Sequence, residues 1–207
     1  MDDKKYIALT FDDGPNVEVT PHVLERLEKY GVIASFFVNG KNINEESAKV
    51  MKKADEMGCE IQNHSQNHFD MSKLSESEIK SEIEETDSLV EKYIGKKPAF
   101  FRPPFIRVNE LLYDVVDKTF ICGFCPSDWS TDVTKEKTAE DILNHTKNGD
   151  IILLHDSAHN LKSALALDEI IPGLLAKGFE FVTISELFKK FEVEHKKGVI
   201  YTNLIGK

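Results

Sequence analysis

The stretch Tyr6-Ile7-Ala8-Leu9-Thr10-Phe11-Asp12-Asp13-Gly14-Pro15 passes from an apolar run directly into two carboxylates and a turn. A short apolar run that ends in Gly-Pro predicts a buried β-strand over Tyr6–Phe11. Thr20-Pro21 then supplies a helix N-cap and an N1 proline, and Gly31 ends the helix. The stretch therefore opens a unit in which a helix follows a strand.

The same order recurs to the other end of the chain. Further strands are predicted over 33–38, 59–62, 99–101, 120–125, 151–154 and 179–183. Helices are predicted over 45–57, from the capping box Ser75-x-x-Glu78 to Gly95, over 109–118, from Thr138-x-x-Asp141 to Gly149, over 163–177, and from Ser185 to 191.

About seven strands, each followed by a helix, predict an α/β fold with a parallel sheet. At 207 residues an irregular (β/α) barrel is more economical than an open doubly wound sheet, which is the alternative. The chain contains no linker, low-complexity tract or internal repeat, so we expect residues 1–207 to form a single domain.

Charge and composition exclude several classes of partner. The chain has 26 Lys and Arg against 36 Asp and Glu, a formal net charge of −10 that would repel nucleic acid. No apolar run approaches the roughly 18 residues of a membrane span, and residues 1–5 lack the apolar core of a signal peptide. Neither a Gly-x-Gly-x-x-Gly turn nor a phosphate-binding loop follows any predicted strand.

The cysteines do not form a disulfide framework. Cys59, Cys122 and Cys125 are an odd number, and Cys122-x-x-Cys125 has no second such pair with which to hold zinc. We expect buried free thiols, with a redox pair as the alternative.

The unusual polar residues come directly after predicted strands. They are Asp12 and Asp13 after the first strand, His64 and His68 after the third, Arg102 after the fourth, Asp128 and Trp129 after the fifth, and His155 after the sixth. The carboxyl ends of the strands of a parallel barrel meet at one mouth, so we expect these side chains to converge there.

His64-Ser-Gln-Asn-His68 places two imidazoles at i and i+4, neighbours on one face of a helical turn. Two surface histidines are the alternative reading. Asp13 would complete a set of two histidines and one carboxylate, which leaves metal positions open for water and substrate. Asp12 would then be free to take a proton, and Arg102 could keep it ionised; the alternative role for Arg102 is a structural salt bridge.

His155 is the candidate general acid, with Asp128 as the partner that supports its charged form. The alternative for His155 is a hydrogen-bonded core histidine. Pro103 and Pro104 have no N–H, so the amide of Phe105 is the first donor available to a developing oxyanion. Trp129 and Leu153 would line a small apolar pocket, or else belong to the core.

Five motifs in order resemble those of the polysaccharide deacetylase family, the NodB-homology group also called carbohydrate esterase family 4. They are Thr10–Pro15, His64–His68, Phe101–Phe105, Asp128-Trp129 and Leu153–His155. The resemblance implies the deacetylase barrel and the hydrolysis of acetyl groups from a carbohydrate. It also implies one divalent metal ion, zinc before cobalt, nickel or manganese.

The resemblance also assigns roles by position. It makes Asp13, His64 and His68 the metal ligands, Asp12 the general base tuned by Arg102, and His155 the general acid tuned by Asp128. The Phe105 amide would hold the oxyanion, while Trp129 and Leu153 would grip the acetyl methyl group.

Two departures bear on the substrate. The family's third motif continues with Tyr-Gly where this chain has Phe105-Ile106, and the earlier Asp of its fourth motif is replaced by Cys125. The chain looks most like clostridial acetylxylan esterases, which implies removal of O-acetyl groups from acetylxylan or xylooligosaccharides. N-deacetylation of chitooligosaccharide or peptidoglycan is the alternative within the family.

Two other classes of protein are alternatives to a carbohydrate deacetylase. The metal set also suits a non-haem iron oxygenase, but such chemistry favours a jelly-roll of antiparallel strands, which the strand–helix order contradicts. A catalytically silent carbohydrate-binding barrel would not need all seven polar site residues. We expect a monomer that binds an acetylated polysaccharide or oligosaccharide, without nucleic acid or membrane, and the resemblance favours work outside the cell.

Overall fold

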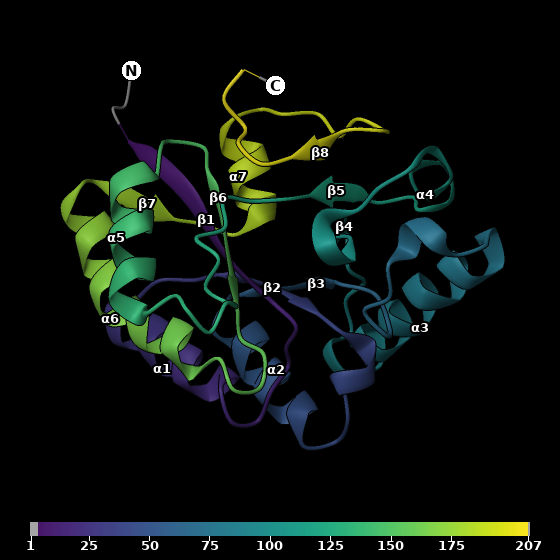
Figure 1. The fold of residues 1–207 in the computed structure, drawn as a ribbon, viewed down its shortest axis with the longest axis horizontal. Helices are drawn as coiled ribbons and strands as arrows, with labels where there is room; N and C mark the ends of the chain where they lie inside the picture. The colour runs from purple at the N-terminus through teal and green to yellow at the C-terminus, as the bar shows by residue number, and fades with distance from the viewer. Residues whose placement is uncertain (1–3, 207) are drawn as a thin grey trace.

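The computed structural model describes residues 4–206, which form one curled parallel sheet with helices outside it (Figure 1). The strands are β1 (Lys5–Asp12), β2 (Ser35–Val38), β3 (Glu60–Asn63), β4 (Phe100–Phe101), β5 (Thr119–Ile121), β6 (Ile151–His155), β7 (Phe179–Phe181) and β8 (Ile200–Tyr201). The helices are α1 (Thr20–Tyr30), α2 (Ser47–Glu56), α3 (Glu76–Ile94), α4 (Glu110–Val115), α5 (Lys135–His145), α6 (Leu161–Ala176) and α7 (Ile184–Lys190). Short 3-10 turns are η1 (Gly40–Asn42), η2 (Met71–Lys73) and η3 (Pro104–Ile106).

The sheet runs in the order β6-β1-β2-β3-β4-β5-β8, and all of these pairs are parallel. β7 pairs with the first three residues of β1. The N–H of Phe124, just after β5, donates to the carbonyl of Ile151 in β6 over 2.8 Å, and the Leu153 N–H returns a bond of 2.9 Å. These two bonds join the ends of the curled sheet, so the predicted irregular (β/α) barrel of parallel strands is confirmed.

Alternation along β1 decides which side chains reach the interior. Ile7, Leu9 and Phe11 pack with the apolar faces of helices α1 and α6, whereas Ala8 packs with Phe37 inside the curl of the sheet. Side chains of a strand alternate between the two faces, so Asp12 has the same orientation as Ala8. The last residue of the central strand is therefore an acid at the barrel mouth.

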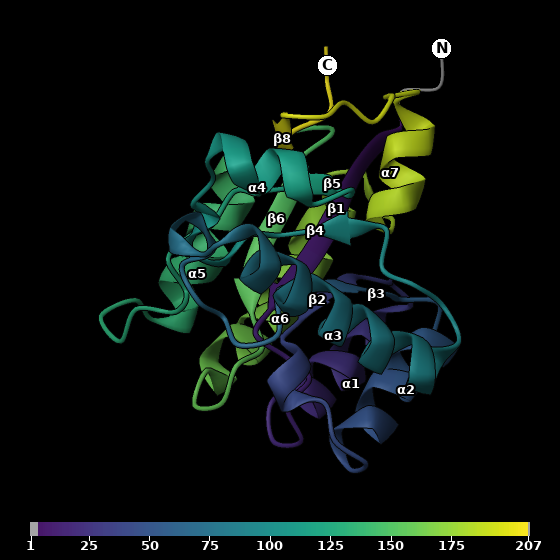
Figure 2. The ribbon, with the colours of Figure 1, turned by 90° about the vertical axis from the view of Figure 1, so that its right-hand side faces the viewer.

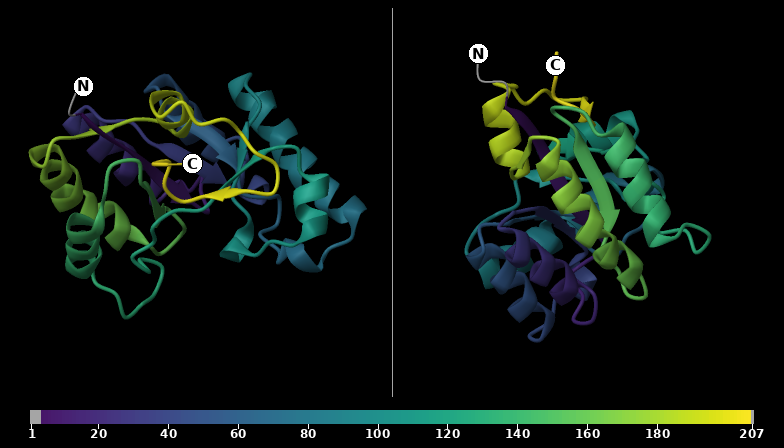
Figure 3. Two further views of the ribbon diagram at one scale, coloured as in Figure 1. Left: turned by 90° about the horizontal axis from the view of Figure 1, so that it is seen from above. Right: turned by 90° about the vertical axis from the view of Figure 1, so that its left-hand side faces the viewer.

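Helices α1 to α6 lie outside the curled sheet (Figure 3), whereas Leu187 and Phe188 of α7 pack in the cluster of Ala8 on its inner face. α1, α5 and α6 form one neighbouring group, and α3 lies beside β3 and α4 (Figure 2). The apolar residues at helical spacing in α1 and α6 are fully buried, which explains why these segments form helices against the sheet.

Three predicted caps are wrong: a neighbouring threonine takes the place of two of them, and the hydroxyl of the third bonds elsewhere. The Thr134 hydroxyl accepts from the N–H of Lys137 and starts α5, so Thr138 lies inside the helix. Thr183 forms the capping box of α7 in place of Ser185. Thr20 is the first helical residue of α1, and its hydroxyl donates to Asp156.

The strand β8 was not predicted from the sequence. The other observed strand and helix boundaries differ from the predicted ones by a few residues. The capping box at Ser75 and the helix end at Gly95 are confirmed. All three cysteines are free, as predicted, but only Cys59 is fully buried; Cys122 and Cys125 are half-buried. Within residues 4–206 no helix has the length and apolarity needed to cross a bilayer.

Candidate active site

The polar residues that follow the strands do meet at one end of the barrel. Asp12 pairs with His155 across the parallel strands β1 and β6. The His64 N–H donates to the Val38 carbonyl over 3.0 Å, and the Arg102 N–H donates to the Asn63 carbonyl over 3.0 Å, so both extend their strands by one residue. The convergence expected from the order of strands is thus observed.

Asp13, His64 and His68 bring three donor atoms to one point. The Asp13 Oδ1 lies 3.6 Å from the His64 Nε2 and 3.4 Å from the His68 Nε2, and all three atoms lie within 4.8 Å of one another. Ligands about 2.0–2.1 Å from a tetrahedral zinc ion are separated by roughly 3.4 Å. The three residues therefore fit a divalent metal ion.

The surroundings of the two imidazoles prepare them as ligands. The Nδ1–H of His64 donates to the Arg102 carbonyl over 2.6 Å, which leaves the Nε2 lone pair for a metal. Burial and the neighbouring His64 lower the pKa of His68, so its ring is neutral at neutral pH. The ring of Phe105 packs edge-on against His68 with 4.7 Å between centroids.

The helical turn predicted for His64–His68 is wrong. These residues form an irregular loop, in which Ser65 (φ 68°) and His68 (φ 59°) adopt left-handed conformations. The Ser65 hydroxyl accepts from the His68 N–H over 3.0 Å and closes this loop. The two rings still meet, with centroids 5.0 Å apart, because the loop folds back on itself.

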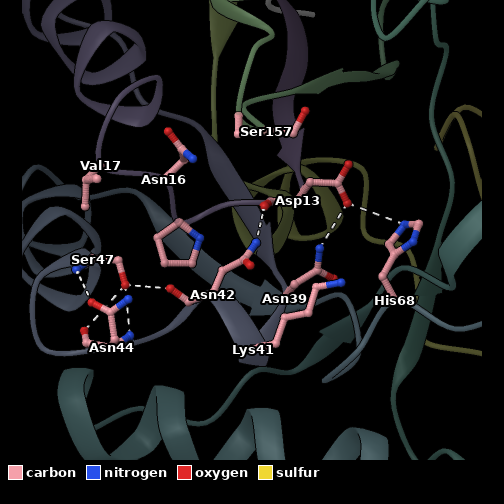
Figure 4. Close-up of a pocket in the computed structure, with 12 residues that line it drawn as sticks. Asp13, Asn16, Val17, Asn39, Lys41, Asn42, Asn44, Ser47, His68 and Ser157 are labelled. Atoms are coloured by element: carbon pink, nitrogen blue, oxygen red, sulfur yellow. Dashed lines mark hydrogen bonds and ion pairs between the residues drawn. The ribbon is translucent and has the colours of Figure 1, made fainter.

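Asp13 is held by two asparagines that the sequence analysis missed (Figure 4). The Asn39 Nδ2 donates to the Asp13 Oδ1 over 3.0 Å, and the Asn42 Nδ2 donates to the Asp13 carbonyl over 2.7 Å. They support a residue in a left-handed conformation, φ 74°. Burial raises the pKa of Asp13, but His64 and His68 outweigh it, and the pKa is lowered overall. Asn39 comes directly after a predicted strand, and this position could have identified it as a site residue from the sequence.

Asp12 and Arg102 form a buried ion pair beside the metal ligands. The Arg102 Nη1 lies 2.5 Å from the Asp12 Oδ1, and its Nη2 donates to the Cys122 carbonyl over 2.6 Å. The guanidinium lies 4.1 Å from the ring centroid of Phe37. Arginine stays charged even when buried, so the Asp12 carboxylate has a fixed positive partner. The other oxygen of Asp12 lies 3.7 Å from the His64 Nε2.

His155 and Asp128 form the second pair. The Asp128 Oδ1 lies 2.8 Å from the His155 Nδ1, and its Oδ2 accepts from the His155 N–H and from the hydroxyl of Ser163. Burial alone would lower the pKa of His155, but the hydrogen bond and charge of Asp128 raise it to about 9. The imidazole is therefore protonated at neutral pH. Nothing in the sequence pattern indicated the contribution of Ser163.

Cys125, Asp128 and His155 also lie close enough together to be considered as a second ligand set. Burial, followed by the charge of Asp128, raises the pKa of the Cys125 thiol to about 12. A thiol that stays protonated is a poor metal ligand, since the thiolate is the form that binds. This cluster therefore supports the protonated imidazole of His155 and does not fit a metal.

A cavity of about 580 Å³ connects these groups. The indole of Trp129, 65% exposed, and the ring of Phe105, 59% exposed, stand at its edge, and the buried Leu153 lies deeper. Its lining also includes Asp12, Asp13, His64, His68, Pro103, Ile106, Cys125 and His155. Ten predicted site residues are thus brought to one place, eight of them in this lining, with Arg102 and Asp128 directly behind it.

The sequence matches a family model described as polysaccharide deacetylase over residues 1–120. A bifunctional xylanase/deacetylase of Pseudobutyrivibrio xylanivorans is 44% identical over 186 residues, which cover 90% of this chain and 31% of that protein. A peptidoglycan-N-acetylglucosamine deacetylase of Bacillus cereus is 34% identical over 194 residues, which cover 90% of this chain and 69% of that protein. The chain thus spans about a third of the first relative.

Two solved structures resemble the whole chain. The Xyl-CE4 domain of a multidomain xylanase from the hindgut metagenome of Trinervitermes trinervoides has a TM-score of 0.96 and 41% identity, covering 99% of this chain and 100% of that one. A family 4 acetyl xylan esterase from Clostridium thermocellum, in complex with a cobalt ion, has a TM-score of 0.94 and 38% identity, covering 97% and 100%.

Proposed function

Because the chain belongs to the polysaccharide deacetylase family, we propose that it is a carbohydrate deacetylase that removes O-acetyl groups from acetylated xylan or xylooligosaccharides with a divalent metal ion. The observation that carries this proposal is the three-donor set of Asp13, His64 and His68, flanked by two tuned acid–base pairs around one cavity. Zinc is the first candidate, and cobalt, nickel or manganese are the alternatives.

Asp13, His64 and His68 would hold the ion. When bound, it would make an attacking water more acidic and draw electron density from the acetyl carbonyl. Asp12, which is hydrogen-bonded to Arg102, is assigned to accept the proton that water loses. The amide N–H of Phe105 is assigned to the developing oxyanion, where a fixed backbone donor costs no reorganisation.

His155 completes the reaction. Its proton passes to the sugar oxygen as the bond between that oxygen and the acetyl carbon breaks, so the products are acetate and a free hydroxyl. Asp128 keeps this proton on the imidazole beforehand. Trp129 and Leu153 supply the apolar surface for the acetyl methyl group.

The choice of xylan rests on the relatives and on the electrostatics. The relatives named as xylanase/deacetylase, Xyl-CE4 domain and acetyl xylan esterase have 38–44% identity, whereas the peptidoglycan deacetylase of Bacillus cereus has 34%. The net charge of −10 also suits a neutral acetylated glycan better than a strongly anionic wall polymer. N-deacetylation of chitooligosaccharide or peptidoglycan is the second candidate, favoured by that Bacillus relative.

The test is acetate release from acetylated xylooligosaccharides and from N-acetyl-chitooligosaccharides, measured side by side with zinc-loaded and chelator-treated protein. We expect acetate from the xylan series that depends on metal and does not need oxygen. Release from the chitooligosaccharides alone would refute the xylan assignment. A requirement for oxygen would point to an oxygenase, and no acetate from any glycan would point to a silent binding barrel.

A further inference from the structure

A second cavity lies against the first and has no part in the chemistry described above. Its volume is about 510 Å³, and it shares Asp13 and His68 with the cavity that contains Trp129. Ligand pockets in proteins occupy about 300–1,000 Å³. Asp13 and His68 form a wall common to both cavities, so a substrate chain that crosses this wall reaches both.

The loops after β1, β2 and β6 build this second cavity, and four of its lining residues are asparagines (Figure 4). Asn39 and Asn42 use their amide N–H groups to hold Asp13. Asn16 and Asn44 are different, because neither contacts a metal ligand. Their side-chain oxygens cap nearby backbone N–H groups, which leaves only their amide groups to be accounted for.

Both of these asparagines use only one end of the side chain. The Asn16 Oδ1 accepts from the N–H groups of Glu18 and Val19, each over 2.8 Å. The Asn44 Oδ1 likewise accepts from Glu46 over 2.9 Å and from Ser47 over 3.1 Å. Within residues 4–206 the Nδ2 group of neither side chain has a partner, so each brings two unused donors to the lining.

The rest of the lining decides what kind of ligand suits these donors. The hydroxyl of Ser157 can donate and accept, the Asn42 Oδ1 can accept, and Pro15 and Val17 add apolar surface. Lys41 brings one ammonium group, already bonded to the Asn67 carbonyl over 3.0 Å. A phosphate or carboxylate would use the donors but not the acceptors or the apolar patch. A pyranose unit, with hydroxyls at its rim and C–H groups on its faces, uses all three.

We propose that this second cavity is a sugar subsite, which binds the unit of the glycan chain next to the acetylated one. The proposal rests on the proposed function of carbohydrate deacetylation and names the residues that read the flanking unit. Asn16 and Asn44 donate to its hydroxyls, and they act on substrate affinity without touching the acetyl group.

The first test needs no variant. The metal-loaded protein is assayed on acetylated xylose and on singly acetylated xylobiose and xylotriose, and kcat/KM is compared. Two or more hydrogen bonds to a flanking unit should raise kcat/KM about tenfold or more from the single sugar to the longer substrates. Equal values across the series would overturn the subsite.

The second test uses Asn16→Asp and Asn44→Asp. Aspartate keeps the oxygen that accepts the backbone N–H groups, but it replaces the free amide donor with a second acceptor. Asn148→Asp is the matched control: the Asn148 Oδ1 also accepts a backbone N–H, from Tyr6 over 2.7 Å, and this side chain lies outside both cavities.

Each subsite variant should raise KM for the trisaccharide about five- to tenfold. The control should not, and hydrolysis of 4-nitrophenyl acetate and zinc affinity should stay unchanged in all three. An unchanged KM in both subsite variants, or an equal loss on 4-nitrophenyl acetate, would contradict the proposal. If the wild type releases acetate only from N-acetyl-chitooligosaccharides, the xylan assignment fails by itself, and the same comparisons are made on that series.

Discussion

Two adjacent carboxylates, Asp12 and Asp13, have different surroundings because they lie on either side of the end of β1. Asp12 is the last residue of the strand, faces the interior and is paired with Arg102. Asp13 leaves the strand in a left-handed conformation and turns toward the two histidines. One short change in backbone direction therefore separates a candidate base from a candidate ligand.

This separation predicts different consequences for the two residues. Asp12→Asn should keep the metal bound, because the three donor atoms are untouched, while acetate release falls by about 10²–10⁴-fold with the loss of a general base. Zinc affinity is measured by competition with a chromophoric chelator, and activity by acetate release. Asp13→Asn is the companion variant and should lose zinc affinity. If Asp12→Asn loses the metal as well, the two roles are wrongly assigned.

The pair of Asp128 and His155 predicts a pH profile. The pKa of His155 is raised to about 9, and a general acid acts only while protonated, so kcat should fall as pH rises through about 9. In Asp128→Asn the burial remains but the supporting charge is gone, so the pKa falls and the declining limb should move to lower pH by more than one unit. The measurement is kcat against pH from 5 to 10. If the declining limb does not move in this variant, His155 is not the group whose titration causes it.

At the residue scale, a site residue could be predicted from the sequence when it belongs to a motif that lies at the end of a strand. Asp12, His64, Arg102 and His155 each come at or just after the end of a predicted strand, and each lies at the mouth as expected. The support behind them could not be predicted in the same way. Ser163 reaches Asp128 from the first turn of α6, and only the packing of that helix on the sheet brings the two together.

At the scale of elements, the strands and helices were predictable because apolar periodicity and glycine stops mark them locally. Gly31, Gly95 and Gly178 do end or follow their helices in left-handed conformations. The choice between neighbouring caps was not predictable, since Thr134 and Thr138 both fit the pattern of a hydroxyl before an acidic residue. β8 is only two residues long, and it forms by pairing with β5, a contact between segments far apart in the chain.

The end of β6 is tied to the loop after β1 by a fully buried carboxyl group, Asp156. Its Oδ2 accepts from the Thr20 hydroxyl over 2.5 Å, while its Oδ1 has no partner among the described residues. Burial raises the pKa of Asp156 to about 7, well above the 3.8 of an exposed aspartate. The folded protein thus keeps a proton here that the unfolded chain loses at lower pH.

This difference predicts a destabilisation at higher pH. Between about pH 4 and 7 the folded state binds more protons at Asp156 than the unfolded state does. The free energy of unfolding therefore falls as the pH rises through this range, and this loss of stability is constant above about pH 7. Asp156→Asn removes it. The free energy of unfolding of the variant, relative to wild type, should therefore be higher at pH 8 than at pH 5 by a few kcal/mol, at about 1.4 kcal/mol per pKa unit. Urea unfolding at both pH values measures this, and a difference that does not change with pH contradicts it.

At the scale of the whole molecule, the site joins segments that the chain keeps apart. Asp13 follows β1, and His64 and His68 follow β3, with α1, β2, α2 and β3 between them in the chain. Asn39, at the end of β2, links the two by its bond to Asp13. The barrel therefore brings the three donor atoms together, and binding of an ion would fasten the loop after β1 to the loop after β3.

That coupling predicts that the stability of the fold depends on metal. An ion that binds only the folded state should stabilise it by about 2.7 kcal/mol when its free concentration is 100 times Kd. Chelator-treated protein with and without zinc is compared by urea unfolding. His68→Ala should abolish the gain because it removes one of the three donors, whereas His22→Ala, which removes an exposed histidine on α1 that pairs with Glu25, should retain it. An equal gain in both variants would mean that zinc binds elsewhere and that Asp13, His64 and His68 do not form the metal site.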